Sequence, residues 1–116
     1  MTIQLAVAGV SGRMGRALLE AIDADADCLL AAAIDRAGSP LVGQDAGVVY
    51  GTVAGVPVIS QIEGGLTNAQ ALIDFTRPEA TLAYLDVCVA NKLPLVIGTT
   101  GFDAAGTARI QTAAGY

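Results

Sequence analysis

The 116-residue sequence has no histidine, and its only lysine is Lys92. The absence of histidine excludes, for this chain, the commonest acid–base catalyst and all histidine metal ligands. The two cysteines, Cys28 and Cys88, are far apart and have apolar neighbours, which predicts buried free thiols. No cluster of cysteines and carboxylates replaces the missing histidines, so we expect no metal site.

Charged and aromatic residues are also scarce, at 15% and 4% of the chain, whereas hydrophobic residues make up 53%. This composition predicts one folded domain whose core is filled by small aliphatic side chains. The net charge of −5 argues against nucleic acids and anionic membranes as partners. The sequence begins without a basic leader and has no apolar run of membrane-spanning length, so we expect a cytoplasmic location.

Short apolar runs alternate along the chain with segments of helical periodicity. Such alternation predicts an α/β fold of the Rossmann type, a doubly wound parallel sheet with helices on both faces, in a single domain over residues 1–116. Residues 37–57 are rich in glycine and predict a loop with short edge strands near residues 48–50 and 56–59. The expected strands are 3–9, 29–34, 71–75 and 94–98, the expected helices are 11–23, 78–91 and 103–114, and a short turn or helix is expected at 60–67.

Helical spacing also predicts which side chains face the sheet. In the first helix, Met14, Leu18, Ala21 and Ile22 fall on one face. In the second helix the corresponding face carries Ala80, Tyr84, Val87 and Cys88.

The most informative motif is the turn after the first expected strand, which runs Gly9, Val10, Ser11, Gly12, Arg13, Met14, Gly15. Glycine permits a sharp strand-to-helix turn, a close approach of the backbone to a pyrophosphate, and close packing of the helix on the strand. The free N–H groups of the helix's first turn then face the phosphates. The alternative is a tight structural turn that binds nothing, but the strand before the glycines and the helix after them favour dinucleotide binding.

The end of the second expected strand carries an acidic and a basic residue in succession. Asp35 stands where dinucleotide folds place a carboxylate that accepts hydrogen bonds from the adenosine ribose, which selects NADH. Arg36 follows it and could pair with the 2′-phosphate of NADPH. The pair therefore predicts a site that accepts either cofactor, and the alternative is an ordinary turn after a strand.

Two further strand ends carry unusual residues where ligands bind in such folds. Phe75, Thr76 and Arg77 follow one strand, and Thr76 with Glu79 also matches a helix capping box. Gly98, Thr99 and Thr100 follow another strand, and their backbone and hydroxyl groups could bond the nicotinamide end of a cofactor. The alternative there is a glycine-flanked turn before a helix.

Taken together, these segments resemble the dihydrodipicolinate reductases, which act in the lysine and diaminopimelate pathway of bacteria and plants. The resemblance extends along essentially the whole chain. The matching stretches are VAGVSGRMGR at 7–16, residues 33–47 with SPLVGQDAG, IDFTRPEAT at 73–81 and VIGTTGFD at 96–103.

The resemblance implies a role for each candidate residue. The turn Gly9, Val10, Ser11, Gly12, Arg13, Met14 would hold the pyrophosphate of NADPH or NADH. Asp35 would meet the adenosine ribose and Arg36 the 2′-phosphate, although many members have glutamate where Asp35 stands. Phe75, Thr76 and Arg77 would flank the cofactor, and Gly98, Thr99 and Thr100 would hold its nicotinamide end.

The resemblance also implies that the catalytic residues, the substrate contacts and a homotetramer interface belong to a second domain absent from this chain. We therefore expect no catalytic residue here, and cofactor binding without turnover. One alternative is a stand-alone nucleotide-binding or sensor module. Another is the cofactor half of a different dehydrogenase, such as one acting on a semialdehyde, although the stretches at 73–81 and 96–103 argue against it.

Overall fold

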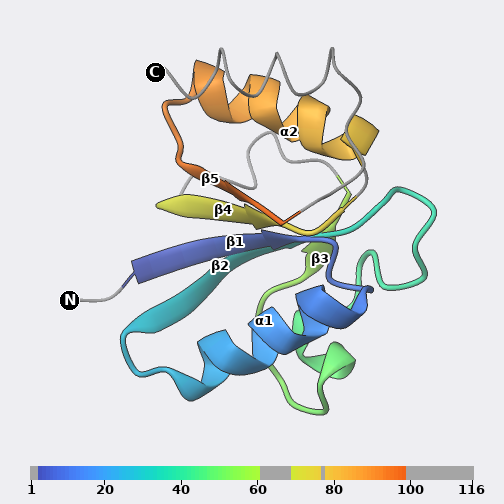
Figure 1. Ribbon diagram of the computed structural model, residues 1–116. Coiled ribbons are helices and arrows are strands. Elements are labelled where there is room, and N and C mark those ends of the chain that lie inside the picture. The colour runs from blue at the N-terminus through green and yellow to red at the C-terminus, as the bar shows by residue number, and fades with distance from the viewer. Residues whose placement is uncertain (1–2, 61–68, 77, 99–116) are drawn as a thin grey trace.

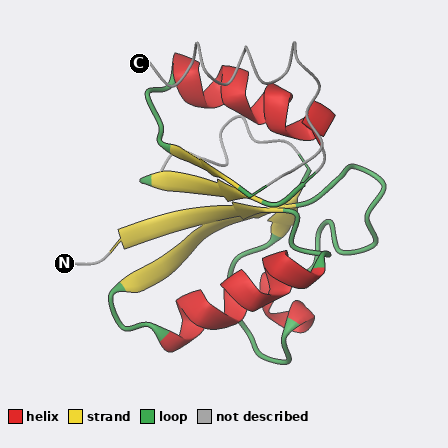
Figure 2. Ribbon diagram, in the orientation of Figure 1, coloured by secondary structure: helices red, strands yellow, loops and turns green. Residues whose placement is uncertain are grey.

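The computed structural model describes residues 3–60, 69–76 and 78–98. Five parallel strands form one sheet in the order β3-β2-β1-β4-β5, with helices on both of its faces (Figures 1 and 2). The predicted fold class is therefore confirmed. The strands are β1 (Ile3–Ala8), β2 (Cys28–Ile34), β3 (Val58–Ile59), β4 (Ala71–Asp74) and β5 (Leu95–Ile97), and the helices are α1 (Arg13–Ala24) and α2 (Pro78–Ala90).

The order in which the chain adds strands to the sheet reverses at β1. From β1 the chain passes through α1 to β2 and β3 on one side, and it later returns to β4 and β5 on the other side. In doubly wound sheets the loops separate at such a switch point and leave room for a ligand at the carboxyl ends of the strands. The expected last helix, 103–114, and nearly all of segment 60–67 lie outside the described residues.

The core consists of two apolar layers, one on each face of the sheet. Successive strand residues point to opposite faces, so Val7 packs toward α1 while Ala6 and Ala8 pack toward α2. The α1 layer also contains Val10, Leu19, Ile22, Ala33, Ala46 and Val58, and the α2 layer contains Ala32, Ile34, Leu72, Tyr84 and Cys88.

The buried face of α1 differs from the predicted one. Its buried residues are Gly15, Leu19 and Ile22, whereas Met14 is 50% exposed and Ala21 is exposed. Gly15 packs against the turn that leaves β1. Because of this contact, the face of α1 that points to the sheet is shifted by about one residue from the face that the apolar side chains predict. The α2 prediction was better, because Tyr84 and Cys88 are buried and Ala80 and Val87 pack against the same layer.

The glycine-rich loop forms one of the two short strands expected in it. Strand β3 lies within the expected 56–59 segment, but the strand expected at 48–50 is wrong, because a 3-10 helix, Ala46–Val49, occupies that position. The Asp45 carboxylate accepts hydrogen bonds from the N–H groups of Gly47, Ala54 and Gly55 at 2.8, 2.8 and 2.7 Å. These bonds hold the loop in a coiled form that an extended strand could not adopt.

Both cysteines are free, but they are not equally buried. Cys88 is buried as expected, while Cys28, at the start of β2, is only half-buried. No helix in the described part of the chain is long and apolar enough to cross a membrane.

We predict that Asp45→Asn destabilises the protein near neutral pH, and that this difference disappears in acid. Hydrogen bonds from the Ala54, Gly47 and Gly55 N–H groups lower the pKa of Asp45 below its ordinary value of 3.8, despite an opposing effect of burial. Because the folded-state pKa is the lower one, the stabilisation is present above the unfolded-state pKa and is lost as pH falls through the folded-state pKa. Urea denaturation of both proteins from pH 7 to about pH 2 measures it. An unchanged gap at all pH values would contradict the assignment.

Candidate functional site

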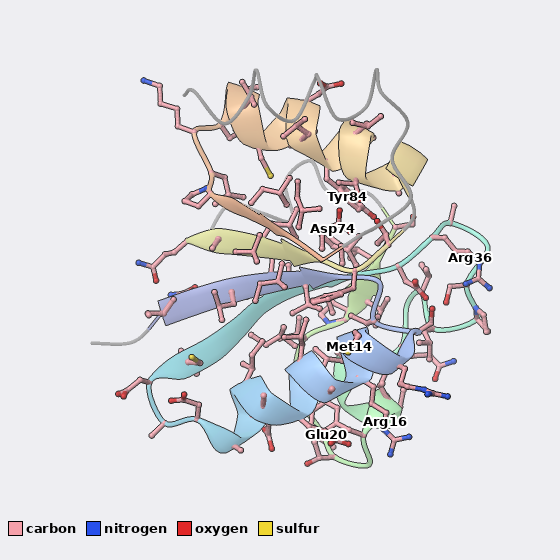
Figure 3. The ribbon with its side chains drawn as sticks, in the orientation of Figure 1. Met14, Arg16, Glu20, Arg36, Asp74 and Tyr84 are labelled. Carbon is pink, nitrogen blue, oxygen red and sulfur yellow. The ribbon has the colours of Figure 1, made fainter. Side chains whose placement is uncertain are left out.

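The predicted site residues that the structure describes gather at one edge of the sheet. Gly9 follows β1, Asp35 follows β2, Phe75 follows β4 and Gly98 follows β5, and all four strands are parallel. Their carboxyl ends therefore point the same way, toward the edge at which α1 begins (Figure 1). Met14 and Arg36 also lie at this edge (Figure 3). Arg77, Thr99 and Thr100 lie outside the described residues.

Backbone contacts determine the shape of the turn between β1 and α1. Gly9 has a φ of +89°, and a Cβ atom there would stand 2.8 Å from the carbonyl oxygen of Phe75. A Cβ on Gly15 would overlap the carbonyl group of Gly9. The Gly9 N–H donates to the Ile34 carbonyl at 2.8 Å, and the Gly12 N–H donates to the Gly9 carbonyl at 3.0 Å. The first and third glycines are therefore sterically required, as the motif predicts.

The N-terminus of α1 is open to a ligand. Its N-cap is Gly12, which has no side chain to satisfy the first N–H groups, and no acidic residue lies in the first turn. Residues 11–14 are exposed. The unsatisfied N–H groups and the positive end of the helix dipole make such an N-terminus a site for an anion such as a pyrophosphate.

Asp35 and Arg36 differ sharply in their surroundings. Asp35 is only 4% exposed, and its Oδ1 accepts a hydrogen bond from the Ser11 hydroxyl at 3.0 Å. Arg36 is exposed and extends from the loop after β2 (Figure 3). The structure thus brings Asp35 against the glycine turn and leaves the guanidinium of Arg36 accessible to an anionic group.

Phe75 and Gly98 are in direct contact at the ends of β4 and β5. A Cβ on Gly98 would overlap the ring of Phe75. The Phe75 N–H donates to the Ala8 carbonyl at 3.3 Å, and the Gly98 N–H donates to the Asp74 carbonyl at 2.8 Å. The aromatic ring is thereby packed against the backbone that follows β5.

Asp74, the last residue of β4, is an important residue of this edge that the sequence motifs did not single out. It is completely buried, and its Oδ1 accepts hydrogen bonds from the Thr76 N–H at 2.9 Å and the Thr76 hydroxyl at 2.5 Å. The Thr76 hydroxyl also lies 3.4 Å from that of Thr81 in α2. A carboxylate that ends an otherwise apolar strand, ALID, was the available signal.

Asp74 lies close to two titratable side chains of α2, Tyr84 and Cys88. Burial and the negative charge of Asp74 raise the pKa of Tyr84 to about 12 and the pKa of Cys88 to about 11. Both groups therefore stay protonated at neutral pH, and they pack as core residues. Figure 3 shows Tyr84 beside Asp74. Among the residues described, no three histidine, cysteine, aspartate or glutamate side chains are grouped as metal ligands.

These features together define a class of protein. A dinucleotide-binding Rossmann domain consists of a parallel sheet whose strand order reverses at β1, a glycine turn before a helix without a side-chain cap, and a carboxylate after β2. The site fits a dinucleotide, because Gly9 and Gly15 let α1 pack directly against the end of β1 and the Gly12 N-cap places no side chain before the first N–H groups of α1.

Comparison with known proteins identifies the family. Residues 3–116 match the family described as "Dihydrodipicolinate reductase, N-terminus", and the chain belongs to this family. It is 60% identical over 114 residues to the 4-hydroxy-tetrahydrodipicolinate reductase of Thiobacillus denitrificans and 55% identical over 111 residues to that of Laribacter hongkongensis. These alignments cover 98% and 96% of this chain but only 43% and 42% of the relatives, so the chain spans less than half of their length. It is thus a nicotinamide-dinucleotide-binding domain of that family.

Solved structures agree on the fold. A dipicolinate-bound dihydrodipicolinate reductase from Paenisporosarcina sp. TG-14 superposes with a TM-score of 0.77 at 23% identity, covering 98% of this chain and 43% of that one. An aspartate semialdehyde dehydrogenase with NADP from Candida albicans gives 0.70 at 14% identity, covering 86% and 30%. At these identities the likeness shows the Rossmann fold alone.

We predict that Gly15→Ala destabilises the protein by about 1–3 kcal/mol, the usual cost of overpacking, because its Cβ would meet backbone that cannot rotate away. This cost exceeds the gain in helix propensity of about 1 kcal/mol. Gly38→Ala is the matched control, since nothing lies within 4 Å of its added Cβ. Urea denaturation compares the two, and equal stabilities would refute the close packing of α1 on the turn.

We also predict that Asp74→Ala costs about 1–3 kcal/mol of unfolding free energy, because a buried donor loses its acceptor. Asp74→Asn retains the Oδ1 acceptor and should lose less. Thermal and urea denaturation of both variants test this order. If Asp74→Asn proved as damaging as Asp74→Ala, the negative charge and not the two Thr76 hydrogen bonds would be the important feature.

Proposed function

We propose that the protein to which this chain belongs is a 4-hydroxy-tetrahydrodipicolinate reductase, and that this domain supplies its NADPH or NADH site. Family membership supports the reaction, and the curated relatives carry that name. The observation that carries the cofactor role is the uncapped N-terminus of α1 behind a glycine turn that no side chain obstructs.

In this proposal each strand end contacts a different part of the cofactor. The turn Gly9, Val10, Ser11, Gly12, Arg13, Met14 holds the pyrophosphate, with the open N–H groups at the start of α1 facing the phosphates. Asp35 and Arg36 lie at the strand end where the adenosine ribose and its 2′-phosphate bind. Phe75, Thr76 and Arg77 flank the cofactor, and Gly98, Thr99 and Thr100 hold its nicotinamide end.

The domain's contribution to the reaction is to position the cofactor. The nicotinamide supplies a hydride for reduction of the substrate, and the protein sets its orientation and surroundings. The ring of Phe75, held by Gly98 and the Ala8 carbonyl, gives the reactive end an apolar wall. The chain has no histidine, and its single lysine, Lys92, follows α2 at the opposite edge from the glycine turn.

The remaining length of the relatives accommodates a second domain. We propose that this domain binds the dicarboxylate substrate, donates the proton and forms a homotetramer, and that residues 1–116 act as the cofactor domain of a cytoplasmic enzyme of lysine and diaminopimelate biosynthesis. Nucleic acids and membranes are not expected as partners of a chain with a net charge of −5.

We predict that Arg36→Ala weakens NADPH binding by roughly tenfold, the size of one lost charge-assisted hydrogen bond, and leaves NADH binding nearly unchanged. Isothermal titration calorimetry at fixed low salt measures both affinities. Arg16→Ala is the matched control, because it also removes one exposed positive charge but its guanidinium pairs with Glu20 at 3.3 Å within α1. Equal losses for the two cofactors, or for the two variants, would contradict the role of Arg36.

A further inference from the structure

The carboxylate of Asp35 is unusual for a residue that is expected to select a ribose. It lies directly after β2 and is only 4% exposed. Its Oδ1 is engaged by the Ser11 hydroxyl at 3.0 Å. Its Oδ2 is buried and has no hydrogen-bond partner among the residues described.

Asp35 and Arg36, the two residues expected to contact the adenosine ribose, therefore differ in their access to a cofactor. A ribose 2′-hydroxyl needs an acceptor that it can reach, and a carboxylate held inward by Ser11 presents none at the surface. A 2′-phosphate needs an accessible donor, and Arg36 is exposed. A carboxylate turned outward would also repel that phosphate, so holding it inward favours the phosphorylated cofactor twice.

Ser11 sets the orientation of the Asp35 carboxylate, because its hydroxyl donates to that carboxylate from the glycine turn. It lies in the glycine turn, 24 residues before Asp35 in the sequence, and its backbone position follows from the packing of Gly9 and Gly15. The Ser11 side chain is therefore not available as a phosphate ligand while it donates to Asp35. The turn contributes backbone N–H groups to the pyrophosphate and a hydroxyl to the carboxylate.

We propose that Ser11 is a specificity-determining residue that withdraws the Asp35 carboxylate from the ribose and sets the cofactor preference toward NADPH. It is a positioning residue, because it acts through Asp35. The inference rests on the proposed cofactor function and deepens it, since it states which of the two cofactors the site favours and why.

The test is the ratio of NADPH to NADH affinity in the full protein and its Ser11 variants, measured by calorimetry at fixed salt. Ser11→Ala should lower this ratio by about three- to tenfold, the effect of losing one net hydrogen bond, because the freed carboxylate accepts from the ribose of NADH and repels the phosphate of NADPH. Ser11→Thr keeps the hydroxyl at an exposed position and should keep the wild-type ratio. Ser11→Gly, which also lacks the hydroxyl, should behave as Ser11→Ala does.

The ratio distinguishes this role from a simpler one. If the Ser11 hydroxyl only contacted the pyrophosphate or supported the turn, Ser11→Ala would weaken both cofactors by the same factor and the ratio would not change. An unchanged or increased ratio in both hydroxyl-free variants overturns the proposal. Wild-type protein that binds neither cofactor would instead overturn the proposed function itself.

Discussion

The structure depends on one close approach of backbone to backbone, at the point where the chain leaves β1. The carbonyl group of Gly9 occupies the space that a Cβ atom of residue 15 would need, and the carbonyl oxygen of Phe75 lies 2.8 Å from the position of a Cβ atom on residue 9. Three segments, from β1, α1 and β4, therefore meet without any side chain between them. Because packed interiors tolerate little extra volume, this contact determines how close α1 lies to the sheet and which of its faces is buried.

The candidate site follows from that contact. A helix drawn tightly against the end of β1 directs its unsatisfied N–H groups past the edge of the sheet, and Gly12 as N-cap leaves them open. On one side of the turn, Ser11 bonds the carboxylate that ends β2. On the other side, Asp74 fixes Thr76, and Gly98 fixes the ring of Phe75. The site is thus a set of strand ends organised around one glycine turn.

Much of this could be predicted from local sequence. The apolar runs indicated β1, β2, β4 and β5, and the glycine spacing with Asp35 and Arg36 indicated the class of ligand. Local patterns failed where a distant partner decides the outcome. The prediction of Met14 as a core residue was wrong, because Gly15 and not an apolar side chain makes the closest contact of α1 with the sheet. The strand predicted at 48–50 was wrong, because the Asp45 carboxylate accepts hydrogen bonds from N–H groups nine and ten residues away. The Ser11–Asp35 bond likewise joins segments whose proximity only the folded sheet creates.

The central claim is that the N-terminus of α1 holds the pyrophosphate of a nicotinamide dinucleotide. A crystal structure of the protein grown with NADPH tests it most directly. The expected result is a pyrophosphate within hydrogen-bond distance of the N–H groups of residues 13 and 14, with the 2′-phosphate beside Arg36 and the Asp35 carboxylate still bonded to Ser11. A cofactor bound elsewhere on the sheet, or phosphates that make no contact with the first turn of α1, would contradict it.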